Sequence, residues 1–141
     1  MYQGAGILLI RKQEGKTLIG LAKRAIHPQK NHWSIPGGKM DAKDQGDFFR
    51  CALRETREEL FAGLPEEMAK IEQLRPIGSA SISIPFTFKW KTYFYDVGDS
   101  VLSTRLNFEL SEFAWFESNK LPEKTHYGVV YALLKMRLIG F

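Results

Sequence analysis

A segment with three glutamates at helical spacing, close behind a pair of glycines, is the feature that most constrains this chain. Glu55, Glu58 and Glu59 are spaced i, i+3 and i+4 within residues 54–59. On an α-helix this spacing places the three carboxylates on one face, where like charges repel one another. Mg²⁺ and Mn²⁺ prefer hard oxygen ligands and would remove that repulsion; the alternative is a solvated helix surface. The spacing therefore predicts a helix here with a candidate metal-binding face.

The helix predicted around these glutamates begins at Asp47, a good N-cap, and runs to about Leu60. Apolar and small side chains recur along it and predict a buried stripe beside the acidic face; they are Phe48, Phe49, Ala52, Leu53 and Thr56. Residues 62–65 contain a glycine and a proline, which end the helix.

The segments on either side of this helix predict strands. Apolar or alternating patterns mark residues 6–10, 17–22, 33–35, 71–84, 86–95 and 113–116. Residues 36–38 predict a turn, residues 66–70 one further helical turn, and Thr125 the N-cap of a final helix through Ile139. This order predicts an α/β or α+β sandwich, a mixed sheet flanked by helices, with residues 1–141 forming a single domain.

Composition and charge narrow the function classes. With 141 residues and 44% hydrophobic composition, the chain suits one domain with a proper core. Its net charge of +4 favours encounters with polyanions such as nucleotides, while the lack of a basic and aromatic cluster argues against a nucleic-acid partner. The lone Cys51 fits a reducing compartment and predicts core packing rather than a nucleophile. Without a visible signal peptide or apolar span, we expect a cytoplasmic protein with no membrane partner.

The order of glycine pair, helix and acidic run resembles the signature of the Nudix hydrolases, G-x₅-E-x₇-R-E-U-x-E-E-x-G-U, in which U is a bulky apolar residue. Gly38 matches the first glycine, residues 54–55 the central Arg-Glu pair, and residues 58–59 the metal-binding pair. The resemblance extends over most of the chain, because residues 24–28 and 33–38 are similar to the family's approach to this signature. Residues 109–116 and 120–122 are similar to its approach to the last core strand and the C-terminal helix.

The chain departs from the signature in three places. Residues 39–53 separate Gly38 from Arg54, two positions more than in the family pattern, which implies a longer loop before the helix. Counting back from Arg54, the signature's first glutamate falls on Gly46, so this acid is missing in register, with Asp44 or Asp47 as substitutes. The second glycine falls on Phe61, and Thr56 replaces a bulky apolar residue.

The resemblance implies a set of metal ligands and catalytic residues. It assigns Glu58, Glu59 and the Gly37 carbonyl as ligands of Mg²⁺, or alternatively of Mn²⁺, and Glu55 as a further ligand or a hydrogen-bond partner in catalysis. It also implies that Arg54 orients a neighbouring carboxylate, because a guanidinium fork can hold one bidentately. The general base is predicted to be Glu109, a loop acid ahead of the last strand, with Glu112 as the alternative.

Residues outside the acidic helix are predicted to bind substrate. Lys23, Arg24 and Lys39 are candidates for phosphate contacts, although basic loop residues are more often solvated. Trp90 and Tyr127 are compatible with either core packing or a surface on which a base stacks.

Taken with the resemblance, these residues predict divalent-metal-dependent hydrolysis of a pyrophosphate bond in a nucleoside diphosphate linked to another moiety. The partner would be a small nucleotide or a molecule like a nucleotide sugar. The alternative is a catalytically weak Nudix domain that binds a nucleotide or sugar nucleotide as a sensor. The sequence leaves the oligomeric state open, with a homodimer among the alternatives.

Overall fold

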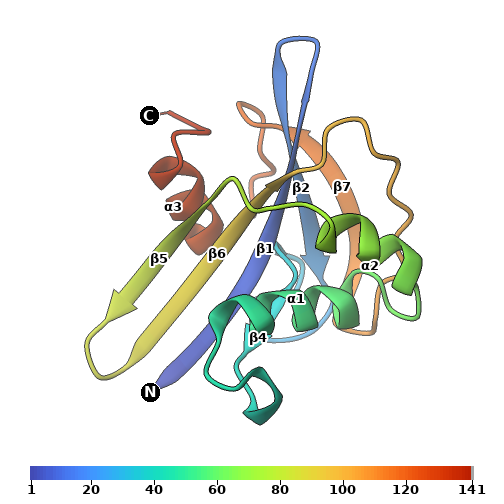
Figure 1. The fold of residues 1–141 in the computed structure, drawn as a ribbon. Coiled ribbons are helices and arrows are strands. Elements are labelled where there is room, and N and C mark those ends of the chain that lie inside the picture. The colour runs from blue at the N-terminus through green and yellow to red at the C-terminus, as the bar shows by residue number, and fades with distance from the viewer. Residues whose placement is uncertain (141) are drawn as a thin grey trace.

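The computed structural model describes residues 1–140 and is built around a seven-stranded mixed sheet (Figure 1). The central path runs in the order β3-β2-β1-β6-β5, with β4 paired to β1 and β7 paired to β2. The strands are β1 (Tyr2–Gln13), β2 (Lys16–Arg24), β3 (Trp33–Ser34), β4 (Gly37–Lys39), β5 (Gly78–Ile84), β6 (Phe88–Asp96) and β7 (Leu110–Glu117). The predicted mixed sheet flanked by helices is confirmed.

β1 lies at the centre of the sheet because its apolar run is buried on both faces. It pairs in parallel with β6 and antiparallel with β2 and β4. Ala5, Ile7 and Leu9 belong to the core beneath the acidic helix, whereas Leu8 and Ile10 belong to the core beneath the last helix. Because successive side chains of a strand point to opposite faces, β1 contributes to two apolar layers on opposite sides of the sheet.

The helices lie on both sides of the sheet (Figure 1). They are the short 3₁₀ helix η1 (Ala42–Asp44), α1 (Phe48–Glu59), α2 (Pro65–Glu72) and α3 (Tyr127–Lys135). The predicted N-cap is confirmed, because Asp47 Oδ1 accepts from the backbone N–H of Phe49 at 2.9 Å and of Arg50 at 3.4 Å. None of the helices in residues 1–140 is long and apolar enough to cross a membrane.

Two predictions about segments near the acidic helix were wrong. Residues 36–38 were expected to form only a turn, but Gly37 and Gly38 belong to β4 and pair with Gly6 and Ala5. Residues 71–84 were expected to form one strand, but α2 continues to Glu72 and β5 begins at Gly78. A short apolar run is compatible with either a strand or a buried helix. Here the segment is helical, with Met68 and Ile71 buried on one face of α2.

The last helix was predicted too long. Its N-cap is His126, whose Nδ1 accepts from Gly128 N at 2.9 Å, whereas the Thr125 hydroxyl donates to the Pro122 carbonyl. α3 ends at Lys135, and Arg137 adopts a left-handed φ of 56° soon after, so the helix does not reach Ile139.

Candidate functional site

β4 brings the glycine pair directly against the acidic face of α1. The Gly37 N–H donates to Glu59 Oε2 at 3.1 Å. A Cβ on Gly38 would lie 2.7 Å from the Glu55 carboxylate, so the glycine is what allows α1 to approach this strand. The packing of β4 on α1 therefore unites two predicted glycines with two of the three predicted glutamates.

Glu59 is a buried acid, with only 2% of its surface exposed. Burial, followed by the hydrogen bond and negative charge of Glu55, raises the pKa of Glu59 to about 10, and the charge of Glu109 acts in the same direction. Burial also raises the pKa of Glu55. In the protein alone, Glu59 therefore holds a proton at neutral pH, because ionisation would place a second negative charge beside Glu55 out of water.

Arg54 is the organising cation of the site. Its Nε donates to Asp44 Oδ1 at 2.8 Å and its Nη2 to Asp44 Oδ2 at 2.9 Å, a bidentate pair. Its Nη1 lies 3.1 Å from Glu55 Oε1 and 3.2 Å from Glu58 Oε2, and Nη2 also donates to the Lys39 carbonyl at 3.2 Å. One guanidinium therefore links the loop, β4 and two acids of α1, with its planar donor fork facing Asp44.

Asp44 supplies the acid that the sequence count had placed elsewhere. It is 1% exposed, and the hydrogen bond from Arg54 lowers its pKa. Counting forward from Gly38, instead of back from Arg54, puts Asp44 at the signature's first acidic position. Of the two substitutes expected for this acid, Asp44 is the one that contacts Arg54, and Asp47 has a separate role as the N-cap of α1.

The two additional residues of the loop follow Asp44 and form a turn between η1 and α1. Gln45 and Gly46 have φ values of 53° and 76°, both in the left-handed region. Glycine adopts this conformation without strain, and Gln45 is the left-handed C-cap of η1. The insertion therefore changes the path of the loop after the acid and leaves the Asp44–Arg54 pair intact.

The two candidate bases lie in different surroundings. Glu109 is half-buried immediately before β7, where its N–H donates to Asn107 Oδ1 and its carbonyl accepts from Ala25 N. The preceding Asn107 N–H donates to the Glu59 carbonyl, so this segment is anchored to the end of α1. Glu112 is exposed within β7 and pairs across the strands with Lys23. Its nearness to the end of α1 therefore favours Glu109 over Glu112 as the general base.

The predicted phosphate-contacting residues are spread around the site. Lys39 is exposed on β4, next to the glycine pair. Lys23 Nζ lies 5.9 Å from the centroid of the Trp33 ring, and Arg24 Nε donates to the Pro28 carbonyl at 2.9 Å. Lys39 thus lies beside the acids, whereas Lys23 and Arg24 belong to the end of β2.

Tyr2 is a neighbour of the site that the sequence did not indicate. Burial raises the pKa of its hydroxyl, the charges of Glu55 and Glu59 raise it further, and Arg24 lowers it. The phenol is therefore within electrostatic range of the acids and of Arg24. The signal was absent from the sequence because the N-terminus is brought here by strand pairing, parallel between β1 and β6 and antiparallel between β1 and β4.

The donor chemistry of the acidic face fits a divalent cation, although a closed coordination shell is not formed. In residues 1–140, no group of three or more His, Cys, Asp or Glu side chains has converged into a metal-binding geometry. Glu58 is engaged with Arg54, while Glu55 and Glu59 hydrogen bond to each other. A hard cation would offset both the burial of Glu59 and the repulsion from Glu55, which together raise the pKa of Glu59. The buried Glu59 beside Glu55 is thus the feature that fits a cation.

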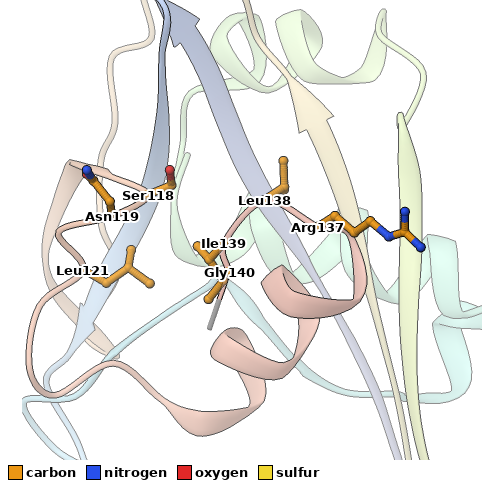
Figure 2. A pocket seen from close by; sticks show the side chains of 7 residues that line it. All are labelled: Ser118, Asn119, Leu121, Arg137, Leu138, Ile139 and Gly140. Atoms are coloured by element: carbon orange, nitrogen blue, oxygen red, sulfur yellow. The ribbon is translucent and has the colours of Figure 1, made fainter.

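A concavity of about 590 Å³ lies elsewhere, between the turn after β7 and the C-terminal end of α3 (Figure 2). Its lining contains no acidic side chain; the residues are Ser118, Asn119, Leu121, Arg137, Leu138, Ile139 and Gly140. None of the residues predicted to bind metal or substrate contributes to it.

Comparisons with known proteins agree with this architecture. The NUDIX domain family model matches residues 2–134, so the chain belongs to the Nudix family. The solved structure of a Caenorhabditis elegans Ap4A hydrolase binary complex is 22% identical, with a TM-score of 0.70 over 96% of both chains. The Mycobacterium smegmatis Nudix hydrolase RenU is 23% identical, with a TM-score of 0.73 over 97% of this chain and 84% of that chain.

A curated relative matches part of the chain. The ADPR responsive transcriptional repressor NtrR of Acinetobacter baylyi is 33% identical over 67 residues, which cover 48% of this chain and 25% of that protein. The match therefore spans only about a quarter of the repressor's length.

Proposed function

We propose that this protein is a pyrophosphohydrolase that cleaves a nucleoside diphosphate linked to another moiety and requires Mg²⁺ or Mn²⁺. The observation that carries the proposal is the buried Glu59, which accepts a hydrogen bond from Gly37 N–H within an acidic face ordered by Arg54. A buried acid with a raised pKa, beside a second acid, costs folding free energy, and a cation-binding function explains why it is kept.

The chain's own residues have separable roles in this proposal. Glu55, Glu58, Glu59 and the Gly37 carbonyl hold the cation, which neutralises phosphate charge and polarises the scissile bond when bound. Arg54 keeps Glu55 and Glu58 on the substrate side, since its fork is fixed by the bidentate contact with buried Asp44. Positioning and charge stabilisation, rather than covalent chemistry, would supply most of the rate.

Glu109 is the proposed general base, and the basic residues are proposed substrate contacts. The charge of Glu109 contributes to the raised pKa of Glu59, and this nearness to the acids supports a role in accepting a proton from the attacking water. Lys39, beside the glycine pair, is the proposed phosphate contact on β4, with Lys23 and Arg24 contacting the more distal part of the substrate.

A second candidate function is a nucleotide sensor. The observations that favour it are the engagement of Glu58 with Arg54 and the partial match to a repressor described as ADPR responsive. In this alternative the same face binds a dinucleotide or sugar nucleotide with little turnover.

One experiment distinguishes the two candidates. Wild-type protein is incubated with ADP-ribose or Ap4A in millimolar Mg²⁺, and monophosphate release and ligand binding are measured separately, with the Glu59→Gln variant as control. Turnover in wild type that falls in the variant supports the hydrolase. Binding without turnover supports the sensor, and neither binding nor turnover contradicts both.

A further inference from the structure

An indole ring lies on a floor of glycines beside the acidic site. A Cβ placed on Gly4 would come within 2.8 Å of Trp90, one on Gly37 within 3.0 Å, and one on Gly6 within 3.1 Å. All of these contacts are to atoms of the six-membered ring. The ring therefore occupies the space that three side chains would otherwise fill, on two neighbouring strands.

This glycine floor adjoins the acids through β4. Along β4 the side-chain direction of Gly37 meets Trp90, while that of Gly38 meets the Glu55 carboxylate. The Gly37 N–H also donates to Glu59. One short strand thus has the acids on one side and the indole on the other, so a ligand that crosses its edge would contact both.

The surroundings of Trp90 are aromatic and partly open. Trp90 is half-buried, and its Nε1 donates to Thr92 Oγ1 at 3.0 Å, which fixes the ring orientation. The next aromatic pair along the same strands is Tyr2 and Phe88, stacked with centroids 5.5 Å apart and an interplanar angle of 10°. In Figure 1, α3 lies beside the part of β5 and β6 away from their hairpin, and Met136 near its end meets Gly78. The aromatic residues lie towards the opposite end of these strands.

We propose that Trp90 is the stacking platform for the nucleobase of the substrate, with the diphosphate lying across β4 at the acidic face. This inference rests on the proposed function and adds the base-binding residue. A planar heterocycle is the occupant because the half-buried indole is held in one orientation and bases stack well on a π surface, whereas a phosphate has no surface that stacks on it. A Cβ on each of the three glycines of the floor would also lie 2.6 Å from a backbone oxygen, so the glycines both allow the backbones to approach closely and leave room for the ring.

The test follows Trp90 fluorescence and nucleotide binding. In a Trp33→Phe, Trp115→Phe background, Trp90 is the sole remaining tryptophan. ADP with Mg²⁺ should quench its emission, whereas inorganic pyrophosphate, which lacks a base, should not. In the otherwise wild-type protein, Trp90→Leu should weaken ADP binding by about 5- to 150-fold, and Trp90→Phe should retain affinity to within about three-fold. Pyrophosphate affinity should stay unchanged in both.

Trp115 gives a matched control, because it is a half-buried tryptophan of β7 that packs against Phe113 and Arg11 instead of the glycine floor. Trp115→Leu should leave the preference for ADP over pyrophosphate intact. Equal effects of Trp90→Leu on ADP and pyrophosphate, or no quenching by ADP, would overturn the platform even if hydrolysis is observed. Quenching by ADP, without hydrolysis of ADP-ribose or Ap4A by the same protein, would support the platform and count against the hydrolase proposal instead.

Discussion

Replacing Glu59 with glutamine should change how stability depends on pH in the metal-free protein. Glu59 has a pKa of about 10 in the folded chain, raised from an ordinary value of 4.5. Between these values the folded state holds a proton that the unfolded state has lost, so the stability of the wild type falls as pH rises. Glutamine resembles the protonated acid in shape and can still accept from Gly37 N–H, but it does not titrate.

The magnitude follows from proton linkage. One proton difference corresponds to about 1.4 kcal/mol per pH unit, so wild type should lose about 3 kcal/mol relative to the variant between pH 5 and pH 7. Because Glu59 is 2% exposed, solvent screening reduces this effect little. The variant should therefore be more stable than wild type at pH 7 and similar to it at pH 4.5.

Urea unfolding in a chelator, at pH values from 4.5 to 8, measures this difference. Glu58→Gln is the matched control, because the Glu58 side chain is 52% exposed and its replacement removes a negative charge from the same helix while the buried Glu59 stays in place. The Glu58 variant should follow the pH dependence of wild type. Parallel curves for wild type and Glu59→Gln would refute the claim that Glu59 is a buried, protonated acid.

The remaining predictions concern catalysis and the loop. Glu58→Gln and Glu59→Gln should each lower turnover by roughly three orders of magnitude, since several kcal/mol of cation-derived stabilisation would be lost, while the metal-free melting temperatures should not fall. A large fall in melting temperature with normal turnover would show these acids to be structural. Glu109→Gln should lower kcat by about 10² to 10⁴ with little change in KM, and a loss seen only in Glu112→Gln would transfer the base to Glu112. Asp44→Asn should destabilise the fold by about 3 kcal/mol or more, because it breaks a buried bidentate ion pair; an unchanged urea midpoint would contradict this.

The acidic face could be predicted from the sequence because helical spacing alone determines which side chains share a face. That Glu55, Glu58 and Glu59 lie together needs only the i, i+3, i+4 rule. The burial of Glu59 could not be predicted in this way, since it depends on how closely β4 approaches α1. That approach is permitted by Gly38, which has no side chain to collide with the Glu55 carboxylate. Gly38 lies on a strand paired with β1, whereas the sequence predicted only a turn for residues 36–38.

The first acid of the signature was placed on Gly46 for a related reason. The position of this acid depends on whether the signature is aligned from Gly38 or from Arg54, because the loop between them is two residues longer than in the family pattern. The structure shows that the additional residues form the turn at Gln45 and Gly46, after Asp44, so alignment from Arg54 misses the acid. In α2, by contrast, the apolar run around Ile71 had no unique period, and its helical state was decided by packing.

The proton count on metal binding tests the central claim most directly. If the cation binds at the acidic face, Glu59 must release its proton, because a carboxylate ligates in its ionised form. Calorimetric titration with Mn²⁺ at pH 7, in buffers of different ionisation enthalpy, should give about one proton released per protein in wild type, and none in Glu59→Gln. Mn²⁺ binding by wild type without proton release, or equal release in the variant, would contradict the assignment of this face as the metal site.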